Sequence, residues 1–590
     1  MSARAGRIGA RVKRGDDPRL LTGRGRYVDD LTLPRLVHTA LVRSAHAHAR
    51  LTRLDLDRAR RASGVVGVLT GDAVARLCKP YRGVLLHYKG MKTGAMLPLA
   101  VERVRYVGEP IVAIAAESRA AADDAAALIE VEYEPLPAVL APDAAVGPGA
   151  PLIHPELGDN ILYETRLAAG DVERAFAGAG RVWTRTFTTG RHTGVPLEPR
   201  SLIADYEPAT RALTVWISTQ VPHMMQAVLA ELFSLREPRV RVIAPDVGGS
   251  FGIKIHVYQD DMAVCALALT LGRPVKFVAS RRESFLSDIH AREQTIRVEA
   301  AADGDGVLTA MRASITAAVG PYSAYPRSSV VEGGQVLRLL PGPYRLRHYD
   351  AALRVVAQNK VVTSQYRAIG HPIATAVTES MIDLVARDLG LDPAEVRRRN
   401  LVRPEDLPYT SATGNVFAFA DVPSIEMYHI ETPAPTIAGG FKGAGEAGAT
   451  GAPAAILNAV NDALAPFGVM LTDSADHAGA RPAGACSDEI AAGWLRQYPA
   501  LMRPRVRAAV LTITLVAGPG LGPANPIQRR PAGPAGQARR GGQIVGSSER
   551  TPVYRGRPGR ARQALTPFSG SFANFGTPML RCYSTNVATS

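Results

Sequence analysis

Cysteine is scarce in this chain of 590 residues, which has only four, and no two of them are close in the sequence. Zinc sites and iron–sulfur clusters are usually recognised by closely spaced pairs such as Cys-x-x-Cys, so no protein-held metal centre of that kind is predicted. Such scattered thiols are typical of a reducing compartment, and we expect a cytoplasmic protein. The four positions are Cys78, Cys265, Cys486 and Cys582.

Long apolar segments are also missing. No run of about 18 apolar residues occurs, so no transmembrane helix is predicted. Residues 1–24 are rich in Arg but have no apolar centre, so no secretion signal is predicted.

Acidic residues are too few to balance the basic ones, and the net charge is +15. Residues 473–590 hold 15 Arg against 5 acidic residues, so the remainder of the chain is close to neutral. Residues 518–562 are dense in Gly, Pro and Arg without a sustained period, and we expect the tail, residues 472–590, to be disordered. It lacks interleaved aromatic residues and a recognisable reading motif, so nucleic acid is not an expected partner.

The first part of the chain alternates strand-like and helix-like patterns. Strands are predicted at 36–42 and 64–70, and a third over 106–115 with a turn near Pro110. Ser118 has the position of an N-cap for an Ala-rich helix that extends to about residue 129, and a strand follows at 130–133. These elements predict a compact α/β domain over residues 15–140, followed by a linker rich in Pro, Ala and Gly.

A second domain is predicted over residues 155–415. Its expected elements are strands at 215–218 and 240–244 and helices at 224–233 and 375–389, the last ending at Gly390. Asp392, Pro393 and Glu395 have the spacing of a capping box. A shorter region, 421–471, contains one helix predicted to begin at Pro453. The whole is an α/β (α+β) chain.

The segment Phe441-Lys-Gly-Ala-Gly-Glu-Ala-Gly448 places one carboxylate in a glycine-rich loop that opens a helix. Glycines allow close approach of the backbone to a ligand, and a helix start offers free N–H groups to an anion. Glu446 is therefore a candidate general base beside a bound anion. A solvated Glu at a helix entry is the alternative. Gly443, Gly445 and Gly448 also match GxGxxG, but no strand precedes them, so a dinucleotide-binding fold is rejected.

Three further segments are candidates for binding. Gly248-Gly-Ser-Phe-Gly252 follows a strand and offers backbone N–H groups, although a tight turn would serve equally well. Arg367, beside Gly370, could bind a phosphate or carboxylate, or lie at the surface. Gln220 and His223 flank Pro222 and could donate hydrogen bonds to a cofactor, or only form a turn.

The order of these motifs resembles that of the molybdopterin-binding large subunits of the xanthine dehydrogenase/aldehyde oxidase/carbon monoxide dehydrogenase family. The resemblance covers about residues 15–470. It is carried by Thr219-Gln220, Gly248–Gly252, Tyr366-Arg-Ala-Ile-Gly370 and Lys442-Gly-Ala-Gly-Glu446, while Arg105–Pro110 looks like part of the family's hammerhead domain.

The resemblance implies a role for each matching residue. Gln220 would bind near the molybdenum oxo group, and Arg367 would contact the cofactor region. The backbone at Gly248, Gly249, Phe251 and Gly252 would hold the pterin, with Gly443 and Gly445 on the second cofactor loop. Glu446 would be the catalytic base, and Ile369 would face the substrate. The pterin holds the molybdenum, so no protein ligand to the metal is implied.

The same resemblance implies an activity and partners. It implies a molybdenum hydroxylase that inserts oxygen from water into an aldehyde or N-heterocycle. Electrons would pass to a 2Fe-2S subunit and an FAD-binding subunit, in a dimer of heterotrimers. The cofactor would be molybdenum–molybdopterin in its cytosine dinucleotide form. Departures from the family pattern at Ile255, Ala368 and Ile369 exclude xanthine and carbon monoxide as expected substrates.

A long central stretch of the family, with further glycine-rich loops, is missing between Phe417 and Val422, so 421–471 is expected to be a remnant of the second cofactor domain. This gap predicts that the chain as written binds cofactor poorly or not at all. It leaves open an alternative interpretation, a non-catalytic remnant that retains only partner binding.

Overall fold

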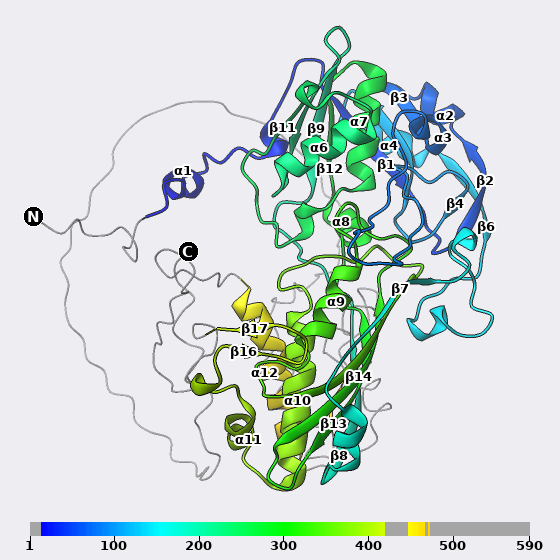
Figure 1. Ribbon diagram of the computed structural model, residues 1–590. Coiled ribbons are helices and arrows are strands. Elements are labelled where there is room, and N and C mark those ends of the chain that lie inside the picture. Colours follow the sequence, from blue (N-terminus) through cyan, green and yellow to red (C-terminus); the bar gives the residue numbers. More distant parts are fainter. Residues whose placement is uncertain (1–12, 419–445, 466–469, 473–590) are drawn as a thin grey trace, which may run out of the picture. The chain divides into compact units, whose positions relative to one another are not determined.

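The computed structural model describes residues 13–418, 446–465 and 470–472 (Figure 1). The chain divides into two units, Met1–Gly518 and Pro519–Ser590, and every described residue belongs to the first. The predicted mixed α/β class is confirmed. Most of the predicted tail, from residue 473 onward, lies outside the described residues. None of the helices in the described ranges is long and apolar enough to cross a membrane.

A seven-stranded sheet joins the two predicted domains. β1 runs parallel to β12 with Val37 opposite Val275, so one sheet contains strands from both regions. The predicted strands at 36–42, 64–70 and 240–244 are confirmed within it. Its order is β11 (Val240–Ile243), β10 (Ala212–Ile217), β9 (Ser201–Glu207), β12 (Val275–Val278), β1 (Val37–Arg43), β5 (Pro110–Ala116) and β3 (Val65–Thr70).

A three-stranded sheet and short helices complete the first region. Ser118 accepts a hydrogen bond from the Ala121 N–H at 3.1 Å, which confirms the predicted cap of α4 (Arg119–Ala127). The sheet order is β4 (Arg103–Val104), β2 (Ala49–Asp55) and β6 (Glu130–Pro135), with α2 (Asp57–Arg61) and α3 (Gly71–Ala75) nearby.

A five-stranded sheet forms the body of the second region, and α9 and α10 pack against it (Figure 1). Its order is β7 (Ile161–Ala169), β15 (His348–Val356), β14 (Leu308–Ala318), β13 (Gln294–Ala302) and β8 (Arg181–Thr189). The helices of this region are α5 (Val172–Ala177), α9 (Val330–Leu339), α10 (His371–Leu389), α11 (Pro393–Asn400) and α12 (Ala447–Leu464), and the short strands β16 (Tyr409–Thr410) and β17 (Val416–Phe417) form a two-stranded sheet.

The remaining helices and 3-10 turns precede the strands or lie between them along the chain. They are α1 (Asp17–Leu21), α6 (Pro222–Leu232), α7 (Gln259–Leu271) and α8 (Arg281–Ser287), with 3-10 turns at η1 (Val28–Asp30), η2 (Asp143–Ala145), η3 (Pro155–Leu157), η4 (Glu237–Arg239), η5 (Ile253–Ile255) and η6 (Pro404–Asp406).

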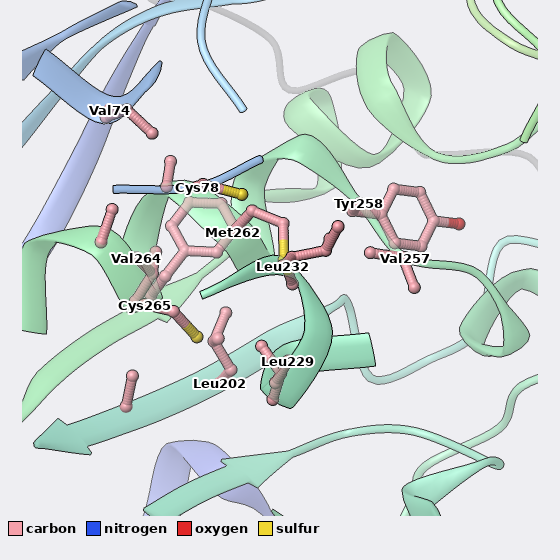
Figure 2. Packing of buried hydrophobic residues seen from close by; sticks show 14 of the residues in the cluster. Val74, Cys78, Leu202, Leu229, Leu232, Val257, Tyr258, Met262, Val264 and Cys265 are labelled. Atoms are coloured by element: carbon pink, nitrogen blue, oxygen red, sulfur yellow. The ribbon is translucent and has the colours of Figure 1, made fainter. Parts of the chain in front are cut away.

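Helix α7 forms the centre of the larger core beside the seven-stranded sheet. Figure 2 shows Met262 and Cys265 of this helix among aliphatic side chains that include Leu202 of β9 and Leu229 of α6. Burial raises the pKa of the nearby Cys78 thiol to about 12, so this cysteine is an inert core residue.

Two predicted helix starts were wrong. α12 begins at Ala447, not at Pro453, because its first turns contain mainly Gly and Ala and show no apolar period. α10 begins at His371, four residues before the predicted start, with Pro372 in its first turn. The Asp392 cap of α11 is confirmed, but Glu395 pairs with Arg398 and Arg399 and does not close a capping box.

A buried ionic cluster connects the first region to the second. Arg43 of β1 makes two hydrogen bonds of 3.0 Å to the Asp260 carboxylate, and Arg200 donates to the same carboxylate at 2.8 Å. Burial alone would raise the pKa of Asp260, but the two guanidinium groups outweigh that effect and hold it at about 2. The regions are therefore connected by charge as well as by the shared sheet.

Candidate functional site

The turn that carries Gln220 joins β10 to α6. The carbonyl of Lys254 accepts hydrogen bonds from the Gln220 N–H at 3.1 Å and from Thr219 Oγ1 at 3.0 Å. Pro222 begins α6, where its missing N–H would have no helical partner in any case. The backbone carbonyl of Lys254 therefore holds this turn in place.

The glycine loop follows β11 and needs its glycines. Gly249 has φ +95° and Gly252 has φ +93°, a region that residues with a Cβ rarely adopt. A Cβ on Gly252 would lie 3.0 Å from the Gln365 carbonyl oxygen and 3.1 Å from Tyr366 Cα. Gly252 therefore allows close contact between the glycine loop and the segment that contains Arg367. Phe251 of this loop is 46% exposed.

Gln220 contacts the glycine loop directly. Its amide oxygen accepts hydrogen bonds from Ser250 Oγ and, at 3.2 Å, from the Gly252 N–H. Its amide nitrogen makes no hydrogen bond to any residue of the described part of the chain. Because the oxygen is occupied, the nitrogen is the group that Gln220 can offer to a ligand.

The Arg367 turn completes this cluster. The Arg367 N–H donates to the Phe251 carbonyl at 3.0 Å, and its guanidinium carbon lies 6.0 Å from the centre of the Phe251 ring. Ile369 is partly buried and closes the turn by donating its N–H to the Tyr366 carbonyl at 3.0 Å. Gly370, with φ +76°, then caps α10. The structure therefore brings together Gln220, Gly248–Gly252 and Arg367.

Two buried ion pairs beneath these loops were missed by the sequence analysis. Glu198 and Lys254 are joined at 2.7 Å under the glycine loop. Arg292 is bound to Glu332 at 2.8 Å and also donates to the Arg367 carbonyl. The two residues of each pair are 56 and 40 positions apart in the sequence, respectively, and no local motif marks such pairs.

Glu446 lies at the entry of α12, as predicted, and is exposed. Its backbone carbonyl accepts hydrogen bonds from the Thr450 N–H and Oγ1, both at 3.0 Å. α12 packs on α10, and Ser380 donates to Asn458 at 2.8 Å between them. Gly443 and Gly445 lie outside the described residues.

The chemistry of this cluster suits a large organic cofactor better than a protein-bound metal. Within the described ranges, no group of three His, Cys, Asp or Glu side chains could hold a metal ion. The cluster offers a glycine loop with positive φ angles, an amide donor on Gln220 and the Arg367 guanidinium. Backbone amides and a guanidinium fit the phosphate and pterin oxygens of molybdopterin, so the residues present fit that group.

Comparison with known proteins agrees with this assignment. Residues 22–137 match the model of the aldehyde oxidase and xanthine dehydrogenase a/b hammerhead domain, and residues 153–401 match that of the molybdopterin cofactor-binding domain.

Individual relatives fall in the same group. The chain is 37% identical over 413 residues to the nicotine 6-hydroxylase large subunit of Paenarthrobacter nicotinovorans, covering 70% of this chain and 50% of that protein. It is 29% identical to the nicotinate dehydrogenase large molybdopterin subunit of Eubacterium barkeri, covering 67% of this chain and 89% of that one. The crystal structure of quinoline 2-oxidoreductase from Pseudomonas putida 86 superposes with a TM-score of 0.67 at 37% identity, over 70% of this chain and 52% of that one. The chain thus spans about half the length of the nicotine hydroxylase subunit.

Proposed function

Because the chain belongs to the xanthine dehydrogenase and aldehyde oxidase family of molybdopterin-binding large subunits, we propose that it is the cofactor-binding subunit of a molybdenum hydroxylase. The observation that carries this proposal is the contact of three separate segments in one cluster. Gln220 binds the Gly252 N–H, and the Arg367 N–H binds the Phe251 carbonyl. These contacts favour a functional cofactor site over a remnant that only binds partner subunits.

The bound cofactor would supply the two-electron oxidation of a substrate carbon, with water as the oxygen source. The residues of this chain would bind and orient it. Gln220 would donate its amide N–H to a cofactor oxygen, and the glycine loop would donate backbone N–H groups. The Arg367 guanidinium would stabilise negative charge. Glu446 would accept a proton at its carboxylate and return it to solvent.

For the substrate we propose an aldehyde or an N-heterocycle. Two of the similar proteins are named for nicotine and quinoline, which are N-heterocycles. Ile369, next to the Arg367 turn, provides an apolar side chain where a flat ring would be bound.

For the partners we propose an FAD-binding subunit and a 2Fe-2S subunit, arranged as a dimer of heterotrimers, and for the pterin its cytosine dinucleotide form. The similar proteins are named as large subunits, which supports an assembly of several chains. Purification of this chain with co-expressed candidate subunits, followed by mass spectrometry of the released pterin, tests both proposals. A pterin without a nucleotide would contradict the second.

Glu446→Gln tests the proposed catalytic role. Turnover per bound molybdenum, measured with an aldehyde and an N-heterocycle and an artificial electron acceptor, should fall by about 10²–10⁴-fold while molybdenum content stays unchanged. Glu395→Gln is the matched control, because Glu395 is also at least partly exposed near a helix start but pairs only with arginines of its own helix. Unchanged turnover in Glu446→Gln would contradict the proposal.

A further inference from the structure

One buried ion pair touches both the glycine loop and the Gln220 turn. Lys254 is 2% exposed, and the Glu198 side chain is 12% exposed. Burying two charges costs several kcal/mol, which the mutual attraction repays only in good geometry. Such a pair at the base of a binding loop therefore calls for a role beyond stability.

The hydrogen bonds of Glu198 are concentrated on one oxygen. Its Oε2 accepts from Lys254 Nζ at 2.7 Å, from the Gly248 N–H at 2.7 Å and from Ser218 Oγ at 2.6 Å. Its Oε1 is buried and has no partner among the described residues. The carboxylate is thus arranged to hold Gly248 and Ser218 in place, and its second oxygen is left buried without a hydrogen-bond partner among the described residues.

The backbone of the same residues extends this connection. The Glu198 N–H donates to the Gly248 carbonyl at 3.1 Å, so Gly248 is bound through both its donor and its acceptor. The Lys254 carbonyl accepts from the Gln220 N–H and from Thr219 Oγ1. A Cβ on Gly248 would lie 2.6 Å from the Glu198 Cβ, so the two chains are in close contact.

We propose that Lys254 and Glu198 are positioning residues that hold Gly248, the first residue of the glycine loop, and the Gln220 turn in one fixed relation. The lysine neutralises the carboxylate, and the carboxylate holds the Gly248 N–H. The geometric part of this inference stands on the contacts alone, and its importance for a cofactor rests on the function proposed above.

Lys254→Met tests the inference by removing the ammonium group and leaving a chain of similar length. Hydrogen exchange of the Gly248 amide and its neighbours, followed by mass spectrometry or NMR, should become at least about tenfold faster, because the buried Glu198 carboxylate loses its counter-charge and the loop that it holds opens more often to water. Amides of β13, in the other sheet, should exchange at the wild-type rate.

Glu198→Gln combined with Lys254→Met provides the rescue. The double variant removes both charges of the pair but keeps a side-chain oxygen that can accept from the Gly248 N–H, so exchange in the loop should return toward the wild-type rate. Glu198→Gln alone leaves the Lys254 charge without a partner, so its exchange should resemble that of Lys254→Met. Lys92→Met is the matched control: it removes a lysine ion pair of the same 2.7 Å length, to Asp159, remote in the sequence from the loop.

Two results would overturn the positioning role: unchanged exchange at Gly248 in Lys254→Met, or an equal acceleration in β13, which would indicate global destabilisation. Molybdenum content, measured on the same samples, separates this inference from the proposed function. Faster loop exchange in a protein whose wild type contains no molybdenum would support the positioning role and refute the cofactor assignment. Faster exchange with a parallel loss of molybdenum would support both.

Discussion

Gly252→Ala is the most informative single change, because Gly252 lies where the glycine loop and the Arg367 segment are in close contact. Two costs follow from the structure. A Cβ at φ +93° is strained by about 1–2 kcal/mol. Placing that Cβ 3.0 Å from the Gln365 carbonyl and 3.1 Å from Tyr366 Cα forces backbone atoms apart, which costs about 1–3 kcal/mol more.

Gly390→Ala separates these two effects. Gly390 also has a positive φ, +67°, but no atom lies within 4 Å of its added Cβ, so only the strain remains. In urea unfolding followed by tryptophan fluorescence, Gly252→Ala should lose about 1–3 kcal/mol more than Gly390→Ala. Equal losses in the two variants would refute the close contact on which the site depends.

Two further predictions concern buried charges. Arg292→Met should leave the Glu332 carboxylate buried without its partner, and the free energy of unfolding should fall by about 3–5 kcal/mol; a loss below about 1 kcal/mol would contradict the pair's burial. Asp260 should make stability depend on pH, because its pKa is about 2 in the folded state and near 4 in the unfolded state. The ionised carboxylate therefore stabilises the fold fully above about pH 4, and this stabilisation is lost as the pH falls toward 2. The difference in unfolding free energy between wild type and Asp260→Asn should therefore shrink by about 1 kcal/mol between pH 5 and pH 3, and a constant difference would contradict the Arg43 and Arg200 contacts.

The fold was predictable where local chemistry decides the structure. The Ser118 cap and the Gly390 stop were found because single residues determine these helix ends. Helix α7 was not predicted, because all sides of Met262 to Ala268 are buried and the apolar residues show no period. The pairing of β1 with β12 was not predicted either, because the paired residues are more than 200 positions apart and no local sequence pattern marks them.

The candidate site was predictable at the level of its loops. Gln220, the glycine loop and Arg367 were identified from turn residues and from a resemblance, and the structure brings them together. The pairs of Glu198 with Lys254 and of Arg292 with Glu332 could not be predicted, because opposite charges far apart in sequence are common and only folding selects which ones meet.

The most direct test of the whole account is the molybdenum content of the purified chain, measured by elemental analysis for wild type and Gln220→Ala side by side. We expect molybdenum in the wild type, below one atom per chain, and a clear loss in Gln220→Ala, because the amide that contacts Ser250 and Gly252 is removed. A wild-type chain free of molybdenum, or a variant with the same content as the wild type, would contradict the assignment of this cluster as the cofactor site.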